Sequence, residues 1–598
     1  MKASLWRVFF YLCFLPFLYL LSRAQNDQVI LPNGFAPGEE ALLPSYLFQV
    51  QNRPRNAITT PPGGSLRNMA EWEEIQALLI TWTAYPSILA EIVRTARQHT
   101  TVLIHCSDSN QVKNYLNNQG IPLSNVKFLE VPYNSIWIRD YGPNSVYRND
   151  VDSLLLVDWI YNRPRPADDA MPEEDAAYFG LPLYETTAPP TDLVYTGGNW
   201  MTDGRGTGFS SRLFLEDNGP GNNFGVTVKD TQDVKQILQA FMGIQRFVHM
   251  QVLPYDGIHH IDMHMKLLDE ETLLVGLYPT GISDGPQIEA NLSYILDHFQ
   301  TVFGTPYKIV RIPMPPSPSG NWPSGGASYR TYTNSVFVNG AIIVPSYREE
   351  YDTIAHRIYR EQLPGYEIKF IDCDNSGANI ISNGGAIHCI TNAVGVKHPL
   401  WISHKKLEDA YEGSGPFQVN ALIKHRSGIQ SATVYWRTDT TQPYQSAPMT
   451  LSNPSQNIWT GYIPDQPGDT YVYYYIQAQA NSGKVQRRPI VAPAGWWRFK
   501  VLKSPNTGLI NECFEKGAFP NPAQNLVCIP VHAFAEMQGR LELMDLQGRL
   551  VRLIHKGSFP QGQYRYYTDV SDLVPGTYIL RLLTERGEAR QKLIVTKQ

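Results

Sequence analysis

The sequence predicts a radial α/β domain followed by two all-β modules. Three observations support this fold class. Strand-like runs alternate with amphipathic helical stretches from about residue 70 to residue 404. Three helical stretches begin near Thr231, Ile288 and Asp352, and each has strands before and after it. Beyond residue 405, short runs rich in Thr, Val and Tyr replace the helices.

The helices are read from apolar positions at three- and four-residue spacing, and the strands from short apolar runs. The predicted helices are Ser87–His99, Thr231–Met242, Ile288–Phe299 and Asp352–Gln362. The predicted strands are Ala77–Trp82, Val102–His105, Leu154–Trp159, Thr272–Leu277, Ser335–Val344 and Glu367–Ile371. Together they indicate a repeated unit of strand pair, helix and strand, which favours a radial arrangement over one open sheet.

The domain boundaries follow from changes in this pattern. We expect the α/β domain over residues 45–404, after a lead-in rich in Pro, Gly, Asn and Gln. Residues 405–502 have the length and the short alternating strands of an immunoglobulin-like sandwich. A linker at Ser504–Asn506 separates this module from a second all-β module over residues 507–598.

Composition excludes several classes of protein. The 598 residues include 50 Lys and Arg against 55 Asp and Glu, a net charge of −5. This chain lacks the basic excess that binding to a nucleic-acid backbone requires, so we expect no nucleic-acid partner. Hydrophobic residues make up 43% and charged residues 18%, which argues against wholesale disorder. A coiled coil and a multi-span membrane protein are excluded as well.

The N-terminus predicts export. Lys2 and Arg7 precede an apolar run from Val8 to Leu21, and small residues follow at Ser22 and Ala24. This order is typical of a secretory signal peptide, here residues 1–24. The alternative is an uncleaved membrane anchor, for which the run is short.

The cysteine count is odd once the signal peptide is removed. Cysteines stand at positions 13, 106, 373, 389, 513 and 528, and Cys13 belongs to the signal. In an oxidising compartment an odd number leaves at least one thiol unpaired. Cys513 and Cys528 are close in sequence and are candidates for a disulfide, whereas Cys106 follows an apolar run and is expected in the core.

Two charged clusters are candidates for chemistry. Asp140 and Arg139 follow Trp137 at the end of a strand, where the alternative is an ordinary strand-end salt bridge. On an extended strand, the side chains of His260, Asp262 and His264 would share one face. Such a face could bind zinc or transfer protons, and the alternative is a plain half-exposed strand.

Two further segments are candidates for a nucleophile and for anion binding. Gly384 and Gly385 permit a tight turn before Cys389, so that a ligand could approach its thiol closely, although a buried inert cysteine is the usual alternative. The prolines of Tyr161–Pro166 enforce extended backbone, so Arg163 and Arg165 would project together as a fork for a carboxylate. A solvated basic loop is the alternative.

Two loop patterns are weaker. Asp372–Gly377 is spaced like the start of a calcium loop, but Asn383 stands where a bidentate acid is expected. Structural calcium there is a minor expectation. The glycine-rich segment Thr196–Gly204 does not open a helix, which disfavours a phosphate cradle.

Taken together and in this order, six motifs resemble the guanidino-group-modifying (pentein) superfamily, specifically its branch of agmatine deiminases and bacterial peptidylarginine deiminases. Each motif is weak alone, but the set is specific. The motifs are Ala70–Glu73, Trp137–Tyr141, Thr196–Asn199, His260–Asp262, Tyr332–Ser335 and Gly385–Cys389.

The resemblance implies the fold and the site. It implies a five-fold pseudo-symmetric α/β propeller for residues 45–404, which agrees with the repeat described above. It implies no catalytic metal, which lowers the standing of zinc at His260, Asp262 and His264. The implied catalytic residues are Asp140, His260, Asp262, Asn334 and Cys389, and the implied substrate-binding residues are Trp137, Asp140, Arg163, Arg165 and Asp262.

The chemistry of the family suits these residues. A guanidinium is planar, cationic and poorly electrophilic, so Asp140 and Asp262 would grip its nitrogens and hold it in position. Cys389 would attack the central carbon as a thiolate and form a covalent thiouronium. His260, with its charged form favoured by the carboxylates, would protonate the departing ammonia and then activate water. Asn334 would orient these groups.

The expected activity is that of a secreted peptidylarginine deiminase, a hydrolase of C–N bonds in linear amidines. It would convert peptidyl-arginine, above all a C-terminal arginine held by Arg163 and Arg165, to citrulline and ammonia. The final module resembles a type IX secretion sorting domain, which implies a Bacteroidetes source and the secretion machinery as a partner. Export through the periplasm, followed by release or attachment to the outer-membrane surface, is the expected route.

One position departs from the family pattern. Gly257 stands about three residues before His260, where the peptide-acting relative has an aromatic that lines the arginine pocket. Two alternatives to the expected activity remain. An agmatine deiminase would share the catalytic residues but need no carboxylate fork, and a surface adhesin would use the propeller only to display the β-modules.

Overall fold

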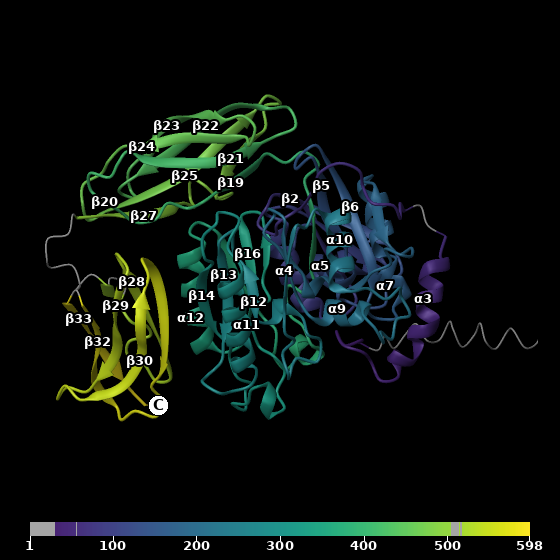
Figure 1. Cartoon of the computed structure of the whole chain (residues 1–598). Coiled ribbons are helices and arrows are strands. Elements are labelled where there is room, and N and C mark those ends of the chain that lie inside the picture. The colour runs from purple at the N-terminus through teal and green to yellow at the C-terminus, as the bar shows by residue number, and fades with distance from the viewer. Residues whose placement is uncertain (1–29, 55–56, 504–512, 515–516, 586, 598) are drawn as a thin grey trace, which may run out of the picture.

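The computed structural model describes residues 30–54, 57–503, 513–514, 517–585 and 587–597 (Figure 1). The predicted signal peptide, residues 1–24, lies outside the described residues. Among the described residues, no helix has the length and apolarity needed to span a membrane.

The chain begins with an N-terminal segment that leads into helix α3 (Leu43–Asn52) through a short helical turn, η1 (Glu39–Leu42). Leu43, Tyr46, Leu47 and Val50 are buried on one side of α3. They pack in a small apolar cluster with residues of the α/β region, namely Ile160, Val194, Phe224 and Val226. Helix α3 is therefore anchored to the α/β region by its own apolar contacts.

The α/β region contains five separate sheets among its described residues. In each, an antiparallel pair continues into a parallel strand, and one or more helices connect the two parallel strands. The strands, grouped by sheet, are β1 (Leu66–Asn68), β5 (Asn144–Arg148), β6 (Ser153–Tyr161), β7 (Leu183–Thr186) and β8 (Val194–Tyr195); β9 (Met201–Thr202), β10 (Thr207–Ser211) and β11 (Arg246–Met250); β12 (Met265–Leu267), β13 (Thr272–Leu277) and β14 (Lys308–Pro313); β15 (Val336–Val338), β16 (Ala341–Ser346) and β17 (Glu367–Asp372); and β18 (Asn392–Gly395), β2 (Ile75–Thr81), β3 (Thr101–Cys106) and β4 (Val126–Glu130).

The last strand of this region pairs with one of the first. Strand β18 lies antiparallel to β2, with Asn392 opposite Leu79. Residues more than 300 positions apart thus complete one sheet, which brings the segment just before β18 back to the start of the region. That segment contains Cys389.

The connecting helices include the four that the sequence predicts. Helix α10 (Thr231–Met242) has the predicted bounds, because Asp230 caps its first turn and Gly243, at φ 73°, ends it. The predicted helices Ser87–His99, Ile288–Phe299 and Asp352–Gln362 correspond to α4 (Pro86–Ala96), α11 (Gly285–His298) and α12 (Glu349–Gln362). The helices without a predicted counterpart are α5 (Ser109–Asn118), α6 (Ile138–Tyr141), α7 (Pro166–Asp169), α8 (Met171–Phe179) and α9 (Leu213–Asn218).

Two predicted strands are wrong. Ser335–Val344 is not one strand: β15 and β16 pair with each other around a turn at Asn339, whose φ of 49° reverses the chain. His260–His264 is not extended either. Ile261–Met263 forms the short 3₁₀ turn η3, and β12 begins only at Met265.

The two C-terminal regions are all-β. The first comprises β19 (Trp401–His404), β20 (Ala410–Tyr411), β21 (Phe417–Lys424), β22 (Ile429–Arg437), β23 (Gln445–Asn453), β24 (Ile458–Ile463), β25 (Thr470–Ala480), β26 (Val485–Arg488) and β27 (Trp497–Leu502). Strand β19 pairs with β21, although it precedes the predicted boundary at residue 404. The second comprises β28 (Leu526–Ala533), β29 (Met537–Met544), β30 (Leu550–Phe559), β31 (Gly562–Asp569), β32 (Gly576–Thr584) and β33 (Gly587–Val595).

The last region lies beside α12 and β14 of the α/β region (Figure 1). Arg565 of β31 forms an ion pair with Glu361 at 2.6 Å, and the Tyr567 hydroxyl donates to the carbonyl of Arg311.

Cys528 is a free, buried thiol, so the disulfide predicted between Cys513 and Cys528 is wrong.

Candidate active site

Helix α6, a single turn, positions Asp140 next to the segment that contains Cys389. Asp140 is fully buried, and its Oδ1 accepts a hydrogen bond from the backbone N–H of Gly198 at 3.0 Å. The backbone N–H of Arg139 donates to the carbonyl of Cys389 at 3.1 Å. Burial, reinforced by the charge of Asp262, raises the pKa of Asp140 to about 7.

The turn η2 (Gly197–Asn199) brings backbone against these side chains, and glycine is required for it. A Cβ on Gly198 would lie 2.4 Å from His260 Nδ1 and 2.8 Å from Asp140 Oδ1. A Cβ on Gly197 would lie 2.0 Å from the carbonyl oxygen of Arg139. The glycine-rich segment disfavoured as a phosphate cradle therefore shapes the site by close backbone approach.

His260 and Asp262 lie at the turn η3, His260 just before it and Asp262 within it. The His260 ring is buried, with Nδ1 3.6 Å from Asp140 Oδ1 and Nε2 3.3 Å from Thr196 Oγ1. Burial lowers the pKa of His260 to about 3, although the Asp262 carboxylate acts in the other direction. The Asp262 carboxylate does favour the charged form, as expected, but desolvation of the imidazolium outweighs this attraction in the free protein.

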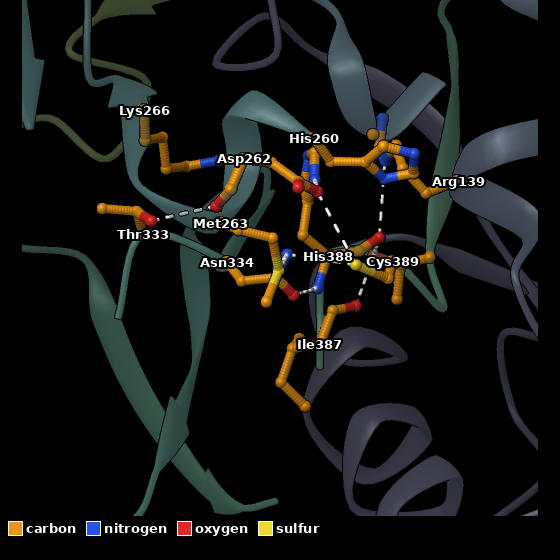
Figure 2. A network of polar contacts seen from close by, with 12 residues as sticks. Arg139, His260, Asp262, Met263, Lys266, Thr333, Asn334, Ile387, His388 and Cys389 are labelled. Atoms are coloured by element: carbon orange, nitrogen blue, oxygen red, sulfur yellow. Dashed lines mark hydrogen bonds and ion pairs between the residues drawn. The ribbon is translucent and has the colours of Figure 1, made fainter. Parts of the chain in front are cut away.

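The Cys389 thiol faces Asp262 and Asn334 (Figure 2). The Asn334 side-chain amide donates to Sγ at 3.1 Å, and Sγ lies 3.7 Å from Asp262 Oδ2. Cys389 is fully buried. Burial, with the charges of Asp262 and Asp140, raises the pKa of this thiol well above its usual value. A cation placed between the carboxylates would remove that electrostatic opposition.

A chain of polar contacts also holds the carboxylate of Asp262 in position. His388 Nδ1 lies 2.7 Å from Asp262 Oδ2, and His388 Nε2 lies 3.3 Å from Glu71 Oε2. Lys266 Nζ binds both oxygens of Glu71, at 2.8 and 2.9 Å. The sequence motifs contain Glu71 and His388, but the residue pattern alone assigned them no role, because nothing in it indicates that they meet Asp262.

The structure brings Asp140, His260, Asp262, Asn334 and Cys389 together, each at most 2% exposed. One oxygen of each carboxylate, Asp140 Oδ2 and Asp262 Oδ1, is buried without a hydrogen-bond partner among the described residues. Buried acceptors of this kind are costly unless a ligand supplies donors. These two acceptors, close to the thiol, match the donors of a planar group with several N–H bonds.

Some predicted ligands lie elsewhere. His264 is buried with neither ring nitrogen bonded among the described residues, and it does not share a face with Asp262 as an extended strand would require. No group of three His, Cys, Asp or Glu side chains in the described part of the chain is arranged to hold a metal ion. In the calcium-like loop, Asp374 forms ion pairs with Arg330 and Arg348, whose charges do not fit a bound cation.

The predicted substrate-binding residues contact the N-terminal segment. The Trp137 ring is fully buried, and its Nε1 donates to the carbonyl of Leu31 at 2.9 Å. Arg163 donates to the carbonyl of Asn33 at 3.1 Å, and Arg165 forms an ion pair with Glu39 at 2.8 Å. The two arginines are thus buried and bonded, at 5% and 1% exposure, and do not form a solvated loop.

The close approach at Gly198 leads to a stability prediction. Gly198→Ala would force His260 and Asp140 apart, and we expect it to reduce the free energy of unfolding by about 1–3 kcal/mol, as overpacking of a core does. The control is Gly257→Ala, where a Cβ would meet no atom within 4 Å. Thermal melting of both variants checks this, and equal melting temperatures would contradict it.

Comparisons with known proteins find similar chains. A protein of Legionella pneumophila named after agmatine deiminase is 23% identical over 367 residues, which cover 58% of this chain and 99% of that protein. A solved structure of a Porphyromonas gingivalis protein named after arginine deiminase is 22% identical and covers 55% of this chain and 98% of its own, with a TM-score of 0.47. The agmatine deiminase of Enterococcus faecalis is 19% identical, with 56% and 99% coverage and a TM-score of 0.46.

Family models match two separate parts of the chain. Residues 517–596 match the secretion system C-terminal sorting domain, so a type IX sorting domain follows the other β region and supports export to the cell surface or secretion. Residues 67–394, which contain every catalytic candidate named above, match the Porphyromonas-type peptidyl-arginine deiminase. Because this match extends over more than half of the 598 residues, the chain belongs to the Porphyromonas-type peptidyl-arginine deiminase family.

Proposed function

We propose that the protein hydrolyses the guanidinium of peptidyl-arginine, preferably of a C-terminal arginine, to citrulline and ammonia. The main support is the arrangement around Cys389: a thiol faces two buried carboxylates, and each keeps one oxygen without a partner among the described residues. A guanidinium supplies five N–H donors in one plane and a positive charge, which this arrangement requires.

In the first step Asp140 and Asp262 hold the guanidinium nitrogens, and the carbon lies against Sγ of Cys389. The bound cation offsets the charges that raise the pKa of the thiol. The S–C bond forms as the thiol proton leaves. His260 is neutral in the free protein, so it can accept that proton, and the imidazolium is then stabilised by Asp140, whose Oδ1 lies 3.6 Å away.

In the second step the imidazolium of His260 gives its proton to the leaving nitrogen. The C–N bond breaks, ammonia departs, and a thiouronium remains on Cys389. Water then adds to the carbon while His260 takes its proton, and the C–S bond breaks to release citrulline and the thiol. Asn334 holds Sγ throughout by its amide N–H at 3.1 Å. No step of this proposal involves a metal ion.

Carboxylate recognition favours a peptide over agmatine. Agmatine has no carboxylate, whereas Arg163 and Arg165 are buried beside the site and Arg165 already binds the carboxylate of Glu39. The space next to Gly257 further suggests a wider arginine pocket than an aromatic at this position would leave. Export, supported by the sorting domain, also separates the enzyme from an intracellular metabolite such as agmatine.

We also infer the arrangement of the α/β region and the location of the enzyme. Five sheets of one connectivity, with β18 returning to β2, support a five-fold pseudo-symmetric propeller. We infer that the type IX machinery recognises the C-terminal domain and that the enzyme acts outside the cell or on the outer-membrane surface. Arginine-containing peptides and proteins are the proposed substrates.

A substrate panel tests the activity. Citrulline or ureido product is measured from a peptide ending in Arg, a peptide with internal Arg, free arginine and agmatine. We expect the peptide ending in Arg to be preferred. We expect Cys389→Ala to abolish ammonia release, while its melting temperature falls only by the small amount that follows from removing a buried thiol. Turnover of agmatine without turnover of any peptide would reject peptidyl-arginine, and activity in Cys389→Ala would reject the covalent route.

The raised pKa of Asp140 leads to a pH prediction. Its carboxylate ionises as pH rises through about 7, and only the ionised form attracts a guanidinium. Binding of a C-terminal Arg peptide to Cys389→Ala should therefore tighten between pH 6 and pH 8, by up to about tenfold per pH unit below the pKa. Calorimetry at several pH values measures this, and Asp140→Asn should bind weakly with no such slope. A flat profile in Cys389→Ala would contradict the assignment.

His388 is expected to act as a positioning residue. His388→Gln removes the bond at 2.7 Å that holds Asp262, and a displacement of about 1 Å in a catalytic group can cost roughly 100-fold in rate. We expect kcat/KM to fall about 10- to 100-fold, with a raised KM because Asp262 contacts the substrate. Glu71→Gln, which retains a hydrogen-bonding group, should show a smaller effect. An unchanged KM together with a lower melting temperature would indicate a structural role only.

A further inference from the structure

The N-terminal segment, residues 31–39, lies across the residues that should bind the substrate. Its backbone carbonyls accept hydrogen bonds from Trp137 at Leu31 and from Arg163 at Asn33. The guanidinium of Arg163 also stacks on the Phe35 ring, 4.5 Å from its centroid. The segment thus uses two of the predicted substrate-binding side chains at once.

The end of the segment places a carboxylate on Arg165. Glu39 contacts Arg165 through both oxygens, at 2.8 and 3.0 Å, in the paired geometry that arginine forms with carboxylates. Arg165 also donates to the carbonyls of Pro32 and Gly34, at 2.8 and 2.9 Å. A carboxylate and two peptide carbonyls are the groups that the C-terminal end of a peptide would present.

The same segment packs on the turn that precedes the thiol. The N–H of Asn33 donates to the carbonyl of Asn383 at 2.8 Å, at the turn that leads through Gly384 and Gly385 to Cys389. Asn33 is 1% exposed. The far side of this turn meets the catalytic groups, since a Cβ on Gly385 would lie 2.9 Å from Cys389 Sγ. The segment therefore packs on the turn that carries the nucleophile.

The segment is joined to the rest of the chain by an exposed link. Glu40, Ala41 and Leu42 are exposed, and Leu42 is 51% exposed. Helix α3, which follows, is anchored by its own buried apolar side chains, and Phe35 is the one side chain of the segment that packs against the edge of their cluster. The contacts of residues 31–39 described above are mostly polar and would be replaced by water or ligand. Departure of the segment would therefore leave α3 and the α/β region in place.

We propose that residues 31–39 are an internal ligand of the substrate site, in which Glu39 takes the place of a peptide carboxylate on Arg165. A peptide substrate must displace the segment, or a cut within residues 40–42 must release it, before the thiol is reached. This inference rests on the proposed function for the identity of the competing ligand. It assigns the segment an autoinhibitory role that excludes substrate until release.

Two readouts on the full chain test the proposal. A recognition sequence for a site-specific protease is inserted within the exposed residues 40–42, and the same folded sample is compared before and after cleavage. Alkylation of Cys389 by iodoacetamide, followed by mass spectrometry, reports access to the thiol without requiring activity. The buried thiols of Cys106 and Cys373 serve as internal references. We expect cleavage to raise both the alkylation rate and citrulline formation about tenfold.

A matched pair of point variants isolates the carboxylate. Glu39→Gln should lower KM for a peptide ending in Arg about tenfold, because the neutral amide binds Arg165 more weakly. Glu40→Gln, one residue further and exposed, should behave like the unmodified protein. A synthetic peptide of residues 30–42, added to the cleaved enzyme, should inhibit it competitively, and the same peptide with Glu39→Gln should inhibit less.

The outcomes separate this inference from the proposed function. Faster alkylation after cleavage, with no arginine compound turned over, would support the covered site and reject the deiminase activity. Turnover of peptidyl-arginine at the same rate before and after cleavage, with alkylation unchanged, would reject the internal ligand and leave the activity standing. Equal KM values for Glu39→Gln and Glu40→Gln would likewise reject the role of Glu39.

Discussion

The burial of two carboxylates against one thiol is the constraint on which the rest of this site depends. Asp140 and Asp262 are both buried, and burial together with the charge of Asp262 raises the pKa of Asp140 to about 7. The same dry environment holds His260 neutral and the Cys389 thiol protonated. A cation bound between the carboxylates would offset the charges that oppose ionisation of the thiol. In the proposed reaction, a near-neutral protein would select a cationic substrate by these two carboxylates, without an acidic surface.

Backbone approach builds this arrangement as much as side chains do. Gly197 and Gly198 allow the turn η2 to touch α6 and His260, and Gly385 allows the nucleophile turn to pack on Trp137. The polar line from Lys266 through Glu71 and His388 then fixes Asp262 in a single orientation. These groups come from different sheets of the α/β region, and the pairing of β18 with β2 joins its last strand to one of its first.

Sequence periodicity predicted the secondary structure correctly where the periodic segment was long. Helix α10 has the predicted bounds because an Asp caps its start and a glycine ends it. The segment of η3 was misread as a strand because alternation over five residues also fits a short turn beside a strand. The parity of the cysteines indicated a free thiol, yet Cys106, Cys373 and Cys528 are free and buried too. Cys389 differs from these cysteines in its contacts with the amide of Asn334 and the carboxylate of Asp262. The number of cysteines does not reveal such contacts.

The sequence by itself determined the family, the repeated strand–helix unit, the sorting domain and the identity of the five catalytic candidates, because these are properties of local motifs and their order. Only the tertiary structure decided the burial, the protonation state and the contacts of those residues. The neutral state of His260 follows from desolvation, which depends on every element that packs over the ring. The roles of His388 and Glu71, and the occupation of Arg165 by Glu39, arise from contacts between segments more than 100 residues apart. Contacts of that range leave no periodic or compositional trace in the chain.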